Sequence, residues 1–335
     1  MTVRVAINGF GRIGRLVLRS IVEHGRRDIE VVAINDLGPV ETNAHLLRYD
    51  SVHGRFPGRV STDSDSIDVG LGPMKVTAIR DPSALPHKAM GVDIALECTG
   101  LFTTRDKASA HIAAGAGKVL VSAPCQDADK TIVFGVNHDS LTPSDLVVSN
   151  GSCTTNCLAP VARVLLDLCG IEHGYMTTIH AYTSDQPTQD TLHSDLYRAR
   201  AAAMSMIPTS TGAAKALGLV LPELAGKLDG SSIRVPTANV SVVDLKIVPA
   251  RAVTRDEVNA AMVAAANGPL RGILETTLDP LVSVDLNHVS ASATVALPQT
   301  QVVGGRLTRV LAWYDNEWGF ATRMADTALA MAAIA

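Results

Sequence analysis

The strongest constraint on the fold is the rhythm of the first 150 residues, where short β-branched runs alternate with stretches of helical periodicity. Stretches of helical spacing cover 12–24 and 104–114. Buried strands bounded by turn residues are predicted at 3–7, 31–35, 74–79, 93–99, 118–122 and 131–135. Strands that alternate with helices predict an α/β domain with a doubly wound parallel sheet and helices on both of its faces.

The pattern changes after residue 150. A helix over about 154–168 is followed by longer strand candidates at 171–182, 231–248 and 306–314, with fewer crossovers between them. This predicts an α+β domain built on a mixed or antiparallel sheet. Residues 183–206 form a polar segment, and a loop of that length usually serves a function or an interface.

The C-terminal segment from Glu317 places Trp318, Met324, Ala328 and Met331 at helical spacing, which predicts one closing helix. The expected organisation therefore has two domains. Residues 1–150, completed by the helix 317–335, form the first domain, and residues 151–316 form the second.

Composition argues against several classes of partner. The 29 basic and 33 acidic residues give a net charge of −4, and no run of Lys and Arg suggests binding to nucleic acid or to a membrane surface. No apolar run approaches the length of a membrane span, and the start "MTVRVAING" lacks the features of a signal peptide. Five cysteines, an odd number, favour free thiols, so a cytoplasmic protein is expected.

A glycine motif follows the first predicted strand. "INGFGRIG" places Gly9, Gly11 and Gly14 in a G-x-G-x-x-G arrangement between strand 3–7 and helix 12–24. Glycines there permit a tight turn and a close approach to a dinucleotide pyrophosphate, as in Rossmann-type domains. Asp36 ends the second strand, where a carboxylate can bind ribose hydroxyls and repel a 2′-phosphate, which favours NAD over NADP. The alternative is a structural turn followed by a solvated aspartate.

A candidate nucleophile stands in "SNGSCTTNCLAP". The turn residues before Cys153 and the helical stretch after it place this cysteine at a helix N-terminus, where first-turn N–H groups stabilise a thiolate or an oxyanion. Cys157, four residues later, raises the alternative of a zinc or redox pair, but no nearby Cys or His supplies further ligands. A buried, inert cysteine is the remaining alternative.

A base must accompany such a nucleophile. His180 ends a predicted apolar strand at the start of the 183–206 segment, a position typical of catalytic residues. Spacing alone leaves His180 and His138 both open for this role.

Six stretches of the chain resemble one family. They are "INGFGRIGR", "SNGSCTTNCLAP", "TTIHAYTSDQ", "STGAAKA", "RVPTANVSVVDL" and "WYDNEWG", and they follow one another in the family's order along essentially the whole chain. Together they resemble the phosphorylating glyceraldehyde-3-phosphate dehydrogenases of the glycolytic, bacterial type. The resemblance implies a homotetramer of two-domain subunits that oxidises D-glyceraldehyde 3-phosphate to 1,3-bisphosphoglycerate with NAD and inorganic phosphate.

The resemblance also implies roles for individual residues. Cys153 corresponds to the nucleophile and His180 to the base, with no metal. Among the cofactor contacts, Arg12 and Ile13 would meet the pyrophosphate and Asn316 the nicotinamide carboxamide. The full cofactor set is Gly9, Gly11, Arg12, Ile13, Gly14, Asp36, Arg80, Ser122 and Asn316. The implied inorganic-phosphate site is Ser152, Thr154, Thr211 and Gly212, and the site for the substrate's own phosphate is Thr183, Arg198 and Arg234.

The chain departs from the family pattern at two places. Gly151 replaces the usual alanine of the cysteine motif, and Thr191 with Leu192 replace a Leu-Pro pair associated with cofactor choice. Two other functions compete. The related erythrose-4-phosphate dehydrogenases lack the phosphate site of "STGAAKA" in this form, and a non-enzymatic NAD-binding or RNA-binding protein would not need the complete catalytic set.

Overall fold

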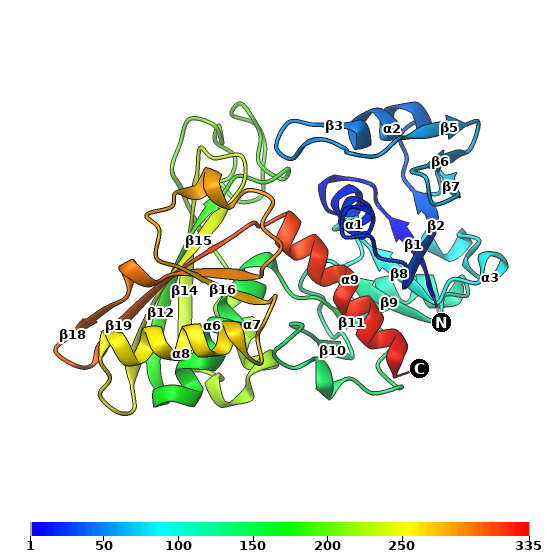
Figure 1. The fold of residues 1–335 in the computed structure, drawn as a ribbon. Helices are drawn as coiled ribbons and strands as arrows, with labels where there is room; N and C mark the ends of the chain where they lie inside the picture. Colours follow the sequence, from blue (N-terminus) through cyan, green and yellow to red (C-terminus); the bar gives the residue numbers. More distant parts are fainter. Residues whose placement is uncertain (1, 335) are drawn as a thin grey trace. The chain divides into compact units, whose positions relative to one another are not determined.

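The computed structural model describes residues 2–334. The chain divides into two compact units (Figure 1). Unit 1 comprises Met1–Ser152 together with Ala321–Ala335, and unit 2 comprises Cys153–Phe320.

Unit 1 is built on a nine-stranded sheet in the order β10-β11-β9-β8-β1-β2-β7-β6-β5. The pairs from β10 to β7 are all parallel, which confirms the predicted doubly wound sheet. The parallel strands are β1 (Val3–Asn8), β2 (Ile29–Asn35), β7 (Pro73–Thr77), β8 (Ile94–Glu97), β9 (Lys118–Val121), β10 (Lys130–Thr131) and β11 (Val147–Ser149).

Helices connect these strands, as the alternating pattern predicts. The α-helices between the strands of unit 1 are α1 (Arg12–Glu23), α2 (Val40–Arg48), α3 (His87–Met90), α4 (Arg105–Ala108) and α5 (Ala110–Ala113). Every residue of β8 and β9 is buried, as expected for strands covered on both faces. In place of the predicted helix 104–114 there are two short helices, α4 and α5, and Ser109 between them is the C-cap of the first and the N-cap of the second.

Three local predictions for unit 1 were wrong or incomplete. The strand expected at 131–135 is reduced to the two residues of β10, and β11 was not predicted at all. The edge of the sheet is antiparallel, because β5 (Ser61–Asp63) and β6 (Ser66–Asp68) form a hairpin against β7. A small separate hairpin pairs β3 (Tyr49–Asp50) with β4 (Gly54–Arg55). Strands this short give almost no periodic signal.

The C-terminal segment of α9 (Trp318–Ala333) belongs to unit 1 from Ala321 onward. Three side-chain contacts attach it there. Lys118 Nζ donates to the Met331 carbonyl at 2.8 Å, Arg26 pairs with Asp326 at 2.8 Å, and the Thr327 hydroxyl donates to Asn150 Oδ1 at 2.8 Å. Within residues 2–334, no helix has both the length and the apolar character needed to cross a membrane.

Unit 2 contains an eight-stranded mixed sheet, as expected for the second half of the chain. The main order is β13-β14-β12-β15-β19-β17-β16, and β18 pairs with β19. The strands are β12 (Ile171–Ala181), β13 (Ile207–Ser210), β14 (Leu228–Val235), β15 (Ser241–Pro249), β16 (Leu274–Thr277), β17 (Ala293–Ala296), β18 (Gln301–Val303) and β19 (Leu307–Tyr314). The pairs β12·β14 and β16·β17 are parallel, and the remaining pairs are antiparallel.

Three helices pack in unit 2: α6 (Cys153–Cys169), α7 (Ala213–Val220) and α8 (Arg255–Asn267). Helix α6 contacts β15, β17 and β19 on the sheet as well as α7 and α8 (Figure 1). Burial alternates along β19, so this strand presents one face to the core.

The strand predicted over 231–248 is two strands, β14 and β15. The break falls at 236–240, where Pro236 has no N–H for a ladder and Val240 adopts φ of 67°. The segment 183–206 carries neither helix nor strand, as expected.

Candidate active site and cofactor cleft

The glycine motif forms a tight turn in which Gly9 and Gly14 have no room for a side chain. Gly9 has φ of 88°, and a Cβ on it would lie 2.7 Å from the Thr99 backbone nitrogen. A Cβ on Gly14 would lie 2.1 Å from the Gly9 carbonyl oxygen. The turn therefore packs against the residues that follow β8, and helix α1 begins directly after Gly11 without a capping side chain. First-turn N–H groups left without a capping side chain suit a pyrophosphate.

A cleft of about 350 Å³ opens beside this turn in unit 1. Of the predicted cofactor residues, Gly9, Gly11, Asp36 and Arg80 line it. Eight lining residues were not predicted: Asn8, Asn35, Leu37, Ile79, Cys98, Thr99, Leu101 and Phe102. Most of these follow the carboxyl ends of β1, β2, β7 and β8, where ligands of parallel sheets bind, so the strand ends themselves could have identified them.

The carboxylate of Asp36 joins the two turns of the cleft. Oδ2 accepts the Phe10 N–H at 2.9 Å, and Oδ1 accepts the Gly38 N–H at 2.9 Å. Each oxygen keeps a second acceptor position, so the carboxylate can still bind hydroxyl groups. The cleft thus fits an adenosine ribose beside a pyrophosphate, which is what a dinucleotide requires.

Three other predicted cofactor residues lie around the motif. Arg12 is the first residue of α1, and its Nη1 pairs with Asp50 Oδ2 at 2.5 Å. Burial of Asp50 opposes its ionisation, but Arg12 and the N–H groups of His53 and Val52 lower its pKa to about 2. Ile13 is half-buried in α1, and Ser122 directly follows β9. The contacts of these residues with a cofactor stay predictions.

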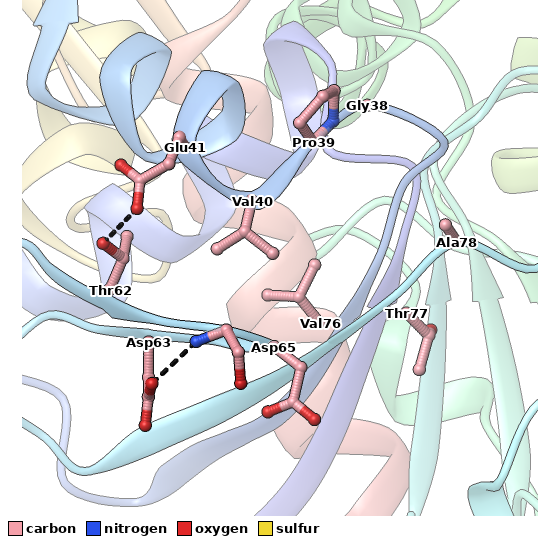
Figure 2. Close-up of a pocket in the computed structure, with 11 residues that line it drawn as sticks. Gly38, Pro39, Val40, Glu41, Thr62, Asp63, Asp65, Val76, Thr77 and Ala78 are labelled. Carbon is pink, nitrogen blue, oxygen red and sulfur yellow. Dashed lines mark hydrogen bonds between the residues drawn. The ribbon is translucent and has the colours of Figure 1, made fainter.

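A second pocket of unit 1, of about 630 Å³, has Gly38 and Pro39 in its lining and is drawn in Figure 2. Glu41, Asp63 and Asp65 line it, and the Thr62 hydroxyl donates to Glu41 Oε1 at 2.5 Å. Lys75 pairs with Asp65. Glu41, Asp63 and Asp65 are exposed and Lys75 offsets part of their charge, so water screens most of their effect on a further phosphate group.

The candidate catalytic pair lies in unit 2. Cys153 is the first residue of α6, and His180 is the penultimate residue of β12. Cys153 Sγ lies 3.4 Å from His180 Nε2. His138, the other histidine left open by the sequence, belongs to unit 1, where its Nδ1 accepts the Gly135 N–H at 3.1 Å. Geometry therefore pairs the cysteine with His180.

The hydrogen bonds of His180 set its tautomer. Nδ1 lies 2.6 Å from the Ala181 carbonyl oxygen, which only accepts, so Nδ1 carries the hydrogen. Nε2 is then an acceptor facing the thiol of Cys153. Burial, followed by the charge of Arg234, lowers the pKa of His180 to about 3, so the imidazole is neutral near pH 7.

The thiol of Cys153 is subject to opposing influences. Burial raises its pKa above the usual value, while the Arg234 guanidinium and hydrogen bonds with Thr154 lower it. The sequence favoured a thiolate stabilised by the helix N-terminus, and the structure adds a desolvation cost to that picture. The geometry consequently suits transfer of the thiol proton to His180 as the sulfur attacks.

Three predicted anion-binding residues converge next to this pair. Arg234 on β14 is the register partner of His180, and its Nη1 donates to Thr183 Oγ1 at 2.6 Å. Arg198 Nη1 pairs with Asp185 Oδ2 at 2.9 Å, and the Thr183 hydroxyl donates to the same carboxylate. Asp185, which sequence reasoning missed, thus pairs with Arg198 directly and is linked to Arg234 through the Thr183 hydroxyl.

Two buried donors of this cluster have no partner in the described part of the chain, Arg234 Nε and Gln186 Nε2. Unpaired buried donors are costly, and a bound anion would satisfy them. Arg198 is held by Thr209, whose hydroxyl accepts from Arg198 Nε at 3.0 Å. Both arginines are thus held at a site suited to a phosphate group.

The residues expected at the inorganic-phosphate site occupy two helix starts. Ser152 precedes Cys153, and Thr154 follows it in α6. Thr211 and Gly212 precede α7, and Thr211 Oγ1 accepts the Ala213 N–H at 3.2 Å. The Thr154 hydroxyl lies 2.9 Å from the Tyr314 hydroxyl, so it is turned toward the core.

Asn316 is connected to the strand that carries His180. Its Oδ1 accepts the Ser241 hydroxyl at 2.8 Å, and Ser241 Oγ also accepts the Ala181 N–H at 3.0 Å. Asn316 is buried, and its Oδ1 orientation is fixed by this bond. A contact with nicotinamide stays a prediction.

The other cysteines have different surroundings. Cys157 is fully buried, and its thiol lies 3.8 Å from the Ala312 carbonyl. All five cysteines are free thiols. Within residues 2–334, no group of three or more His, Cys, Asp or Glu side chains could hold a metal ion.

Comparison with known proteins agrees with this geometry. Residues 3–105 match the NAD-binding domain of glyceraldehyde 3-phosphate dehydrogenase, and residues 152–316 match its C-terminal domain. Glyceraldehyde-3-phosphate dehydrogenases from Xanthobacter flavus and Cereibacter sphaeroides are 72% and 70% identical to the chain over 331 residues, 99% of each protein. The chain belongs to the glyceraldehyde-3-phosphate dehydrogenase family. A family member from Pseudomonas aeruginosa is 60% identical over 334 residues. NAD is the cofactor, and the chain is an NAD-dependent oxidoreductase.

Proposed function

We propose that the chain oxidises D-glyceraldehyde 3-phosphate to 1,3-bisphosphoglycerate with NAD and inorganic phosphate. The observation that carries this proposal is the 3.4 Å approach of Cys153 Sγ to His180 Nε2 beside Arg234. It joins a nucleophile, a base in the accepting tautomer and an anion-binding group in one place.

The first step is addition of the thiol to the aldehyde. Cys153 Sγ forms a bond to the carbonyl carbon, and its proton passes to His180 Nε2. The aldehyde oxygen becomes an oxyanion, which the N–H groups at the start of α6 stabilise. His180 returns the proton to this oxygen and completes a hemithioacetal.

The second step is oxidation. His180 removes the hydroxyl proton of the hemithioacetal while its carbon loses a hydride, which leaves a thioester on Cys153. NAD, when bound, supplies the hydride acceptor. The Gly9–Gly14 turn and Asp36 would hold it, with Arg12, Ile13, Arg80, Ser122 and Asn316 as further contacts.

The third step releases the product. A phosphate oxygen attacks the thioester carbon, the C–S bond breaks, and the Cys153 sulfur recovers a proton from His180. The result is an acyl phosphate. Two phosphate groups must be held at once, so we assign the substrate phosphate to Thr183, Arg198 and Arg234. Inorganic phosphate is assigned to Ser152, Thr211 and Gly212 and to the backbone N–H of Thr154, because the Thr154 hydroxyl faces Tyr314 in the core.

We also propose that unit 1 is the NAD-binding domain and unit 2 the catalytic domain of a homotetramer. Support for assembly comes from segment 183–206, which exposes five large apolar side chains: Leu192, Leu196, Tyr197, Met204 and Met206. Such a concentration of apolar side chains indicates an interface. The proposed compartment is the cytoplasm, because Cys153 must stay reduced to act as a nucleophile.

The test is an assay of NADH formation by the purified protein. Glyceraldehyde 3-phosphate is compared with erythrose 4-phosphate, with phosphate present or absent. We expect turnover with glyceraldehyde 3-phosphate that requires phosphate. Faster oxidation of erythrose 4-phosphate, or multiple turnovers without phosphate, would contradict the proposal.

A further inference from the structure

A row of four polar side chains, three of them buried, crosses the sheet of unit 1. Glu97, Asn8, Asn35 and Thr77 are the last residues of β8, β1, β2 and β7, four strands that lie side by side in that order. The register pairs Asn8 with Glu97 and with Asn35, and Asn35 with Thr77. The row therefore runs along the edge of the sheet where the cofactor cleft opens.

Hydrogen bonds connect the whole row. Asn8 Nδ2 donates to Glu97 Oε2 at 2.6 Å, and Asn35 Nδ2 donates to Asn8 Oδ1 at 2.7 Å. The Thr77 hydroxyl donates to Asn35 Oδ1 at 2.8 Å. Asn35 also bonds both the N–H and the carbonyl of Ile79, so it fixes the backbone next to Arg80. Side chains at all four positions thus fix the lining of the cleft.

Glu97 anchors one end of the row. It is 1% exposed, and four donors surround its carboxylate. The N–H of Thr99 donates to Oε1 at 2.8 Å, and the Thr99 hydroxyl donates to the same oxygen. Thr99 in turn contacts Gly9 closely enough to exclude a side chain there. Glu97 therefore holds the 98–102 turn against the glycine motif.

Two buried histidines complete the anchor. His111 of α5 is 0% exposed, and its Nε2 lies 2.9 Å from Glu97 Oε2. His111 Nδ1 lies 3.0 Å from Nε2 of His87, the first residue of α3. Since an ionised carboxylate only accepts, Nε2 of His111 carries a hydrogen. The His111 ring also lies edge-on to the ring of Phe102, with 6.5 Å between the centroids. Phe102 lines the cleft, so His111 supports the cleft wall there.

We propose that Glu97 and His111 are positioning residues for NAD. They do not belong to the reacting pair in unit 2, and their bonds fix Thr99, Phe102 and Asn8 in the cleft. This inference rests on the NAD cleft of the proposed function and extends it to a buried network behind that cleft. If the residues that line the cleft are already ordered before NAD binds, less conformational entropy is lost on binding, and the affinity for NAD is higher.

Paired substitutions test the role of His111. In His111→Gln the amide nitrogen takes the place of Nε2 and can still donate to Glu97. In His111→Asn the amide nitrogen takes the place of Nδ1 and cannot reach it. We expect His111→Asn to raise the dissociation constant for NAD about tenfold, and His111→Gln to restore most of that loss. Titration calorimetry measures both values.

Glu97→Gln is the isosteric test at the anchor itself. Its amide NH₂ must face either the two donors on the Oε2 side or the two from Thr99, so one hydrogen-bond pair becomes donor against donor. We expect a rise in the NAD dissociation constant of about tenfold or more. KM for NAD should follow, while kcat and the KM values of aldehyde and phosphate stay near wild type.

His173→Asn, at an exposed position of β12, controls for the loss of a histidine elsewhere. Equal weakening by His111→Gln and His111→Asn overturns the inference, and so does an unchanged NAD dissociation constant in folded Glu97→Gln. A fall in Tm and active fraction with an unchanged KM for NAD assigns the network a structural role only, and it also overturns the inference. Failure of the wild type to bind NAD instead overturns the proposed function.

Discussion

At the scale of single residues, the proposed mechanism depends on which atom of the Cys153–His180 pair holds a proton. The Ala181 carbonyl fixes the hydrogen of His180 on Nδ1, so Nε2 is ready to accept from the thiol. Burial disfavours both the isolated thiolate and the isolated imidazolium. When the proton moves from Cys153 to His180, the thiolate and the imidazolium form side by side, and their attraction offsets part of the desolvation cost.

Alkylation should identify Cys153 as the most reactive of the five thiols. Burial raises the pKa of Cys98 to about 12 and of Cys125 to about 11, and it also raises the pKa of Cys157. Cys153 alone has a neutral imidazole at hydrogen-bonding distance from its sulfur among the described residues. We expect iodoacetamide to label Cys153 first, with loss of activity in proportion, and His180→Asn to slow the labelling. Mass spectrometry of partly labelled protein shows the order, and earlier labelling of another cysteine as activity falls contradicts the assignment.

Asp36 should set the preference for NAD over NADP. We expect Asp36→Ala to weaken NAD binding by about 1–3 kcal/mol, because a charged acceptor for ribose hydroxyls is lost. NADP binding should weaken less, because repulsion of the 2′-phosphate is relieved at the same time.

Asp36 also accepts the Phe10 and Gly38 N–H groups, so part of any loss can come from the turns. Asp63→Ala, in the pocket of Figure 2, removes a carboxylate of the same surroundings without touching those turns. Binding titrations with both cofactors compare the variants. If the ratio of NAD affinity to NADP affinity is unchanged in Asp36→Ala, Asp36 does not determine the preference between the two cofactors.

At the scale of elements, the sequence predicts best where burial is continuous and the strand is long. β1, β2 and β12 were predicted nearly to their ends, since apolar runs and glycine turns mark them. The two-residue β10 and the β5–β6 hairpin were not, because they are too short for a periodic signal and depend on pairing with distant partners.

The same distinction applies to the candidate site. Cys153, His180 and the glycine motif stand at strand or helix ends, which a sequence marks by turn residues. Asp185 and the Glu97–His111 pair were missed. Their importance arises from contacts between segments 13 or 14 residues apart, which nothing in the local pattern specifies.

The start of α7 should bind inorganic phosphate. Thr211 and Gly212 precede this helix, and the Thr211 hydroxyl accepts its first N–H, that of Ala213, at 3.2 Å. We expect Thr211→Ala to raise KM for phosphate more than KM for the aldehyde, because the hydroxyl and the first-turn N–H groups face the same anion. Initial-rate kinetics with each substrate varied in turn provide the comparison.

Thr209→Ala is the matched control for Thr211→Ala. Because Thr209 holds Arg198, its loss should raise KM for the aldehyde instead of KM for phosphate. Equal effects of Thr211→Ala on the KM values of phosphate and aldehyde would contradict the assignment of two separate anion sites.

At the scale of the whole molecule, exposed apolar side chains in the 183–206 segment support the proposed assembly. Leu192 is 99% exposed and Leu196 is 81% exposed, both in the 183–206 segment. Arg198, in the same segment, holds Asp185 at the substrate-phosphate cluster. The proposed assembly and the proposed substrate site therefore share one stretch of chain.

A charge in this segment should break the assembly. In Leu192→Asp, a carboxylate would be desolvated at the interface without a partner, which costs more than the contacts there contribute. We expect sedimentation velocity to show a tetramer for the wild type, as proposed, and a smaller species for the variant. KM for glyceraldehyde 3-phosphate should rise as well, because a segment released from a neighbouring copy positions Arg198 less well. Leu71→Asp, at an exposed leucine of unit 1, is the control and should keep the wild-type mass. A Leu192→Asp protein of unchanged mass would place the interface elsewhere, whereas dissociation with an unchanged KM would show that Arg198 is held by its own subunit alone.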